Sequence, residues 1–149
     1  MLKCFFPSWI AAWFVAIFLP STVIAYLGLS EQAAALGSGF DNILATTWKV
    51  ADDVGPFAKL SFGAALLIML FAVPRARLSE PIFYAVSVVC GVVAMLAALV
   101  WLPAEQSRGF GIGLTGARFH RGLMLIYFVG GALAGAAFAF AMRRCAKRG

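Results

Sequence analysis

One stretch of the sequence limits the fold more than any other, an apolar run from Ile82 to Leu102 that contains no charged residue and is enclosed by Pro81 and Pro103. At about 1.5 Å per residue, a helix of this length reaches roughly 30 Å, the thickness of the hydrocarbon core of a bilayer. Charged residues make up only 12% of the chain, whereas soluble domains carry roughly 25%. The sequence therefore predicts an integral membrane protein.

Three further apolar stretches lead us to expect an all-α integral membrane fold, a four-transmembrane-helix bundle that forms one domain over residues 1–149. The predicted spans cover about residues 8–29, 57–73, 82–102 and 122–142, and a basic cytoplasmic tail follows at 143–149.

The first stretch fits two interpretations. Residues 8–29 can form a retained helix that is kinked near Pro20, because proline removes a helical hydrogen bond. Residues 1–25 also have the features of a cleaved signal peptide, with Lys3 before an apolar segment and small residues at its end. We favour the retained helix, because the apolar character continues to Leu29.

Residues 40–52 carry apolar side chains at helical spacing. The stripe contains Phe40, Ile43, Leu44 and Trp48, together with Thr47 and Ala51. This period predicts a short amphipathic helix in the first external loop. We expect it to lie in the outer membrane interface with Trp48 at headgroup depth, and a helix packed over the end of the bundle is the alternative.

Small residues form continuous faces on the last two predicted spans. The predicted helix-packing residues are Ser87, Gly91, Ala94 and Ala98 on one span and Gly131, Gly135 and Ala139 on the other, with a second series at Gly130, Ala134, Ala137 and Ala141. Such faces let helix backbones approach closely. They are one reason to expect other membrane protein chains as partners, in a hetero- or homo-oligomer.

The basic residues predict the orientation. If both termini are cytoplasmic, seven basic residues lie inside (Lys3, Arg75, Arg77, Arg143, Arg144, Lys147 and Arg148) and five lie outside (Lys49, Lys59, Arg108, Arg118 and Arg121). Basic residues favour the cytoplasmic side of a membrane. We therefore expect both termini in the cytoplasm, and the composition points to a bacterial inner membrane.

The cysteines and a glycine-rich motif do not indicate a binding site. The three cysteines, Cys4, Cys90 and Cys145, show no CxxC or Cys/His spacing, so we expect three free thiols and no metal site. Residues 111–116 match GxGxxG, but the strand and βαβ unit that a dinucleotide site requires are missing from the surrounding sequence. We expect a glycine-rich loop there.

Polar residues near the ends of the spans are the candidate ligand sites. Lys59 lies just inside the second span, where it extends to the interface, binds an anionic group or pairs with Asp52 or Asp53. At the outer end of the last span, Arg108, Arg118, His120 and Arg121 form a basic group suited to a lipid headgroup or a quinone oxygen. The same group can serve as an interfacial anchor.

These features lead to three functional hypotheses. We favour a structural or accessory subunit of a larger membrane complex. The alternatives are a small oligomeric transporter or channel lined by Lys59, Ser61 and Ser87, and a membrane enzyme or binder of an anionic headgroup or quinone at the outer face. We predict no catalytic residues and no cofactor other than a bound lipid or quinone. Membrane lipids are expected partners and nucleic acid is not, because the basic residues adjoin apolar runs.

Overall fold

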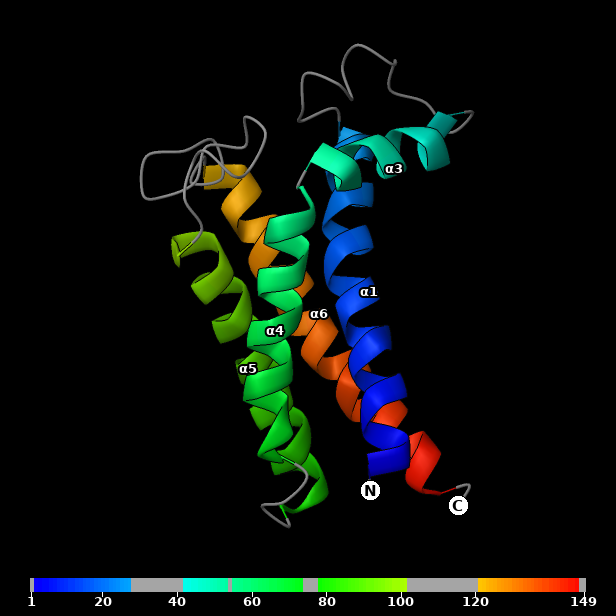
Figure 1. The fold of residues 1–149 in the computed structure, drawn as a ribbon, viewed down its shortest axis with the longest axis vertical. Helices are drawn as coiled ribbons and strands as arrows, with labels where there is room; N and C mark the ends of the chain where they lie inside the picture. The colour runs from blue at the N-terminus through cyan, green and yellow to red at the C-terminus, as the bar shows by residue number, and fades with distance from the viewer. Residues whose placement is uncertain (1, 28–41, 54, 74–77, 102–120, 148–149) are drawn as a thin grey trace.

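The computed structural model describes residues 2–27, 42–53, 55–73, 78–101 and 121–147, and these are helical apart from short connections. The helices are α1 (Leu2–Leu27), α3 (Ile43–Asp53), α4 (Pro56–Phe71), α5 (Glu80–Trp101) and α6 (Arg121–Ala146) (Figure 1). Three of them, α1, α5 and α6, are long and apolar enough to cross a membrane, and the bent pair α3 and α4 is a fourth candidate. The chain thus has the all-helical build of a membrane protein.

Helices α1, α4, α5 and α6 run side by side as a bundle (Figure 1). Helix α6 packs against both α1 and α5, while α4 packs on α5 and touches α1. Both chain termini and the start of α5 lie at one end of the bundle, and α3 lies across the opposite end (Figure 1). We call the first of these the terminal end.

The contact between α5 and α6 brings two backbones together. A Cβ atom added to Gly91 would overlap the carbonyl oxygen of Gly131, and one added to Gly135 would overlap the carbonyl of Ser87. The other small residues of these faces, Ala94, Ala98 and Ala139, are buried. On another side of α6, a Cβ atom at Gly130 would overlap the ring of Pro20 in α1. The small residues are therefore used within this chain.

Helix α4 begins at a sharp bend. It is inclined by 82° to α3, and Gly55 between them has a φ of 79°, which favours glycine. Pro56 follows at the first helical position, where its missing N–H costs nothing. Two tryptophans of α1 hold this helix, since the Trp9 indole donates to the Gly63 carbonyl at 3.0 Å and the Trp13 indole donates to the Lys59 carbonyl at 2.8 Å.

Helix α3 packs on α1 through a face that shares only Thr47 and Ala51 with the predicted apolar stripe. Its buried residues are Thr46, Thr47, Val50 and Ala51, whereas Leu44 and Trp48 are 84% and 66% exposed. The buried stripe is rotated toward Thr46 and Val50 because α1 covers that side. Phe40, the first residue of the predicted stripe, lies outside the described residues.

One expectation from the sequence was wrong. Cys4 and Cys145 form a disulfide, with 5.6 Å between their Cα atoms, so Cys90 is the free cysteine. The two cysteines are 141 residues apart in sequence and meet because α1 begins and α6 ends at the terminal end. The basic residues of the predicted tail begin inside α6, which continues to Ala146. Arg143 and Arg144 favour this continuation because cations stabilise the C-terminal end of a helix.

Candidate functional site

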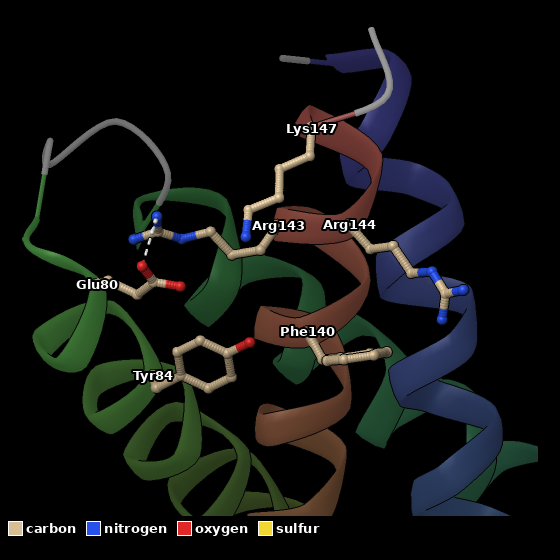
Figure 2. Close-up of a pocket in the computed structure, with 6 residues that line it drawn as sticks. All are labelled: Glu80, Tyr84, Phe140, Arg143, Arg144 and Lys147. Carbon is tan, nitrogen blue, oxygen red and sulfur yellow. Dashed lines mark ion pairs between the residues drawn. The ribbon is translucent and has the colours of Figure 1, made fainter.

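A basic pocket lies at the terminal end, between the start of α5 and the last turns of α6 (Figure 2). Its volume is about 240 Å³, and it is open to the surface. The lining residues are Glu80, Tyr84, Phe140, Arg143, Arg144 and Lys147. We refer to these six residues as the basic pocket.

Helical spacing explains why these side chains share one place. On α6, Phe140, Arg143, Arg144 and Lys147 recur at i, i+3, i+4 and i+7, so they lie on one side of the helix. On α5, Glu80 and Tyr84 are four residues apart and also neighbours. Glu80 lies in the first turn of α5 and the arginines in the last turn of α6, where each charge is favoured by the dipole of its helix.

An aromatic cluster lies beneath the pocket and joins all four helices of the bundle. The Phe5 ring contacts Phe71 at 5.7 Å and Phe138 at 5.6 Å, and Phe138 contacts Phe83 at 6.3 Å between ring centroids. One ring comes from each of α1, α4, α5 and α6. The core that supports the pocket is therefore built from large, mostly buried side chains with few degrees of freedom.

Arg143 is the best-fixed cation of the pocket. Its guanidinium lies 3.7 Å from the Glu80 carboxylate and 5.3 Å above the centroid of the Phe83 ring. The ion pair is solvent-exposed, with 57% of the Glu80 side chain accessible, so it contributes roughly 0.2–1 kcal/mol. Arg143 therefore keeps donors that another anion can use.

The remaining polar side chains of the pocket point in different directions (Figure 2). Lys147 extends its amine back toward Arg143, and the Tyr84 hydroxyl points toward α6, while Arg144 points toward α1 (Figure 2). The Arg144 guanidinium lies 5.9 Å from the centroid of the Phe140 ring. With three cations against one carboxylate, the pocket carries an excess of positive charge. Arginine and lysine donors of this kind bind phosphate or carboxylate oxygens.

An apolar surface continues from the pocket along α6. Phe140, Leu133 and Val129 are 56%, 42% and 47% exposed. They follow Arg144 toward the middle of the helix at i−4, i−11 and i−15, which places them on one side. A cationic end above an exposed apolar surface matches the two halves of a lipid, a charged headgroup and an acyl chain.

Lys59 is the one predicted ligand residue whose side chain the structure describes, and it lies away from the basic pocket. Lys59 lies on α4 near its junction with α3, and its amine is 3.9 Å from the Asp52 carboxylate, which is one of the pairings considered for it. Arg108, Arg118 and His120 lie outside the described residues, as does the side chain of Arg121. The structure therefore does not bring Lys59 into the basic pocket. Ser87, a proposed channel-lining group, is buried and donates to the Phe83 carbonyl of its own helix at 2.8 Å.

Sequence reasoning missed the basic pocket. The sequence assigns the basic end of α6 to topology and to contacts with anionic lipid but to no defined pocket, although the spacing of Phe140, Arg143, Arg144 and Lys147 already forms a helical face with three cations. No sequence signal links Glu80 and Tyr84 to that face, because they come from a different helix. Within the described residues, no group of three His, Cys, Asp or Glu side chains could hold a metal ion.

The chain matches no protein-family model, no curated protein and no solved structure. Its function is therefore inferred from its own geometry.

Proposed function

We propose that this chain is a helical membrane protein that binds the anionic headgroup of a lipid in the basic pocket. The observation that carries the proposal is that the last turns of α6 carry three cations on the same side of the helix as its exposed apolar surface. The basic pocket lies at the opposite end of α6 from Arg121, which belongs to the headgroup site expected from the sequence.

The chemistry of the pocket favours a phosphate. Arg143 and Arg144 offer planar, multidentate donors, and Lys147 adds a mobile ammonium group. Charge-assisted hydrogen bonds to ionised groups contribute roughly 1.5–3 kcal/mol each. A lipid is favoured over a free anion because its acyl chain would cover Phe140, Leu133 and Val129, and because anionic lipids concentrate at the surface where such a pocket would lie.

The proposal includes a placement in the membrane. The basic residues of the terminal end favour the cytoplasmic side of a bacterial inner membrane, with both termini inside. Helix α3 would then lie in the opposite interface. The exposed side chains of Leu44 and Trp48 support this position. The Trp48 ring also lies 5.9 Å from the Phe18 ring between centroids, and Phe18 stacks on Phe14 of α1.

Native mass spectrometry of the full chain tests the binding proposal. Detergent micelles would contain either phosphatidylglycerol or phosphatidylcholine, and bound lipid would be counted on the intact protein. We expect phosphatidylglycerol to bind more tightly. Replacing Arg143→Gln and Lys147→Gln together should weaken that binding roughly tenfold or more, as expected for losing charge-assisted contacts.

Lys49→Gln is the matched control, because Lys49 is an exposed cation on α3 at the opposite end. Its binding should equal that of the unmodified chain. Equal binding of both lipids, or equal losses in the pocket variant and the control, would refute the site. Displacement of the bound lipid by millimolar inorganic phosphate would show that the pocket takes a free anion instead.

A second proposal is the accessory subunit of a larger membrane complex. Helix α4 has 16 residues and reaches only about 24 Å, less than the roughly 30 Å of a hydrocarbon core. Association with another helix is one way to accommodate a span that is shorter than the hydrocarbon core. Leu60 and Ile68 are exposed on the outer side of α4, where such a helix could pack. Purification in a mild detergent should then yield a complex, and a monomer without a co-purifying chain would contradict this proposal.

A further inference from the structure

We propose that Cys4 and Cys145 form a reversible disulfide that controls the affinity of the basic pocket, high in the oxidised protein and low in the reduced protein. This inference rests on the lipid-binding function proposed above and concerns the regulation of the same site. It follows from where the disulfide lies, from how little else holds the end of α6, and from the charge of that end.

The disulfide attaches the part of α6 that carries the cations. Cys145 directly follows Arg144 and lies two residues before Lys147, and its partner Cys4 lies in the first turn of α1. The bond therefore ties the last turn of α6 to a helix that the aromatic cluster holds through Phe5. Fixing Cys145 also limits the positions that Arg144 and Lys147 can take.

Little else holds this turn. Met142 is the last buried residue of α6, and every described residue from Arg143 to Lys147 is half-buried or exposed. Beyond the disulfide, Arg143 pairs with Glu80 at 3.7 Å and lies 5.3 Å from the centroid of the Phe83 ring, and these two contacts of a partly exposed side chain contribute roughly 1 kcal/mol or less each. Helix ends with few buried contacts open locally at low cost in free energy. Without the disulfide, we expect this turn to fray.

Fraying would lower affinity through entropy. In the oxidised protein the cations are already positioned, so a ligand orders few additional residues. In the reduced protein the ligand must also order the last turn of α6, and fixing each residue has a cost in conformational entropy. Preorganisation by a disulfide is therefore expected to change affinity without changing any contact in the bound state.

The proposed cytoplasmic location of the terminal end favours a reversible disulfide over a permanent one. Basic residues place the terminal end in the cytoplasm in our proposed orientation, and cytoplasmic disulfides are commonly transient and redox-sensing. Both cysteines are half-buried, so a small reagent can reach them.

The chemistry balances with a low-molecular-weight disulfide such as oxidised glutathione. One cysteine thiolate attacks a sulfur of that disulfide and releases one small thiolate, which leaves a mixed disulfide on the protein. The second cysteine thiolate attacks the protein sulfur of the mixed disulfide and releases the second small thiolate. Two protein thiols are oxidised, one small disulfide is reduced to two thiols, and a dithiol reductant reverses the reaction.

The experiment compares the two redox states of the unmodified full chain by native mass spectrometry in micelles that contain phosphatidylglycerol. The oxidised and reduced proteins are distinguished by mass, so no mutation is needed. We expect reduction to weaken binding roughly three- to tenfold, because a few residues must be ordered again. The double variant Cys4→Ser, Cys145→Ser should bind like the reduced protein and should not respond to reductant.

A second measurement determines the state of the bond in cells. Rapid acid quenching and thiol labelling should find Cys145 mostly reduced in untreated cells and oxidised after exposure to a disulfide stressor. A bond that is fully oxidised in both conditions would overturn the switch in favour of a permanent cross-link. Equal affinity of both redox states, with preference for phosphatidylglycerol retained, would overturn this inference alone. Loss of that preference in both states would overturn the lipid-binding function itself.

Discussion

Gly91 occupies a position where one methyl group decides whether α5 and α6 can pack. A Cβ atom there would overlap the backbone carbonyl of Gly131, and a backbone atom cannot rotate away as a side chain can. Replacing glycine by alanine in a helix normally gains about 1 kcal/mol through propensity. The overlap has a larger opposite effect, since overpacking costs about 1–3 kcal/mol and more where nothing can move.

We therefore expect Gly91→Ala to lower the thermal midpoint of the purified protein by several degrees. Ala85→Leu is the control, because Ala85 is exposed on the same helix and a larger side chain there meets no packed backbone. Its free energy of unfolding should stay within about 0.5 kcal/mol of that of the unmodified chain. A stabilised Gly91→Ala protein would show that the helices are further apart than described.

Trp13 has a specific role in holding α4. Its indole donates to the Lys59 carbonyl at 2.8 Å and stacks on Trp9 with 5.6 Å between ring centroids. We expect Trp13→Phe to keep most of the ring contact and to lose the hydrogen bond, which lowers stability by about 1 kcal/mol. Thermal unfolding in detergent measures this loss.

Phe14→Leu serves as the comparison, because Phe14 is the next residue along α1 and is 59% exposed. Its effect should be less than half that of Trp13→Phe. If both substitutions had the same effect, the hydrogen bond from α1 to α4 would contribute nothing.

At the scale of elements, α3 exposes two different sides to its surroundings. Leu44 and Lys49 are both exposed, but five residues place them roughly 140° apart around the helix. If α3 lies in the membrane interface, one of these sides contacts lipid and the other contacts water.

We expect a polarity-sensitive fluorophore on Leu44→Cys to emit at a shorter wavelength in vesicles than the same fluorophore on Lys49→Cys. Both variants would carry Cys90→Ser to remove the free thiol, and the Cys4–Cys145 disulfide would remain oxidised. Equal emission from the two sites would show that α3 is covered by protein or stands free in water.

At the scale of the whole molecule, the disulfide joins two ends of the chain that are 141 residues apart. Closing so long a loop stabilises a protein by up to about 5 kcal/mol in the chain-entropy account. The effect in a membrane is expected to be smaller, because helices that stay inserted restrict the unfolded chain already. Reduction should lower the thermal midpoint of the unmodified chain and leave that of Cys4→Ser, Cys145→Ser unchanged, and identical curves would contradict this.

The orientation is a second property of the whole molecule. In a background that carries Cys4→Ser, Cys90→Ser and Cys145→Ser, we expect a membrane-impermeant thiol reagent to leave Ser79→Cys unlabelled in intact cells and to label it after the membrane is opened. Ser79 is exposed and directly precedes α5, whose start lies at the terminal end. Lys49→Cys at the opposite end should label in intact cells. The reverse pattern would place the terminal end outside the cytoplasm, where a disulfide persists without regulation.

Sequence patterns predicted local features of this protein well. The apolar run from Ile82 to Leu102 forms α5, whose bounds lie within two residues of the expected ones at each end. The length of the run and its lack of charge leave few alternatives in a bilayer. The pattern of α3 predicted a helix, but not which side would be buried. That side depends on where α1 passes, and no property of residues 40–52 specifies it.

The sequence by itself determined that this chain is helical and apolar enough to span a membrane, since periodicity and hydropathy are properties of neighbouring residues. Only the tertiary structure decided what the helices bring together: Cys4 with Cys145, Glu80 with Arg143, and the small residues of α5 with those of α6. These contacts join residues that are distant in the chain, and they depend on which helices pack against each other. The basic pocket belongs to this second group, because its two walls come from different helices.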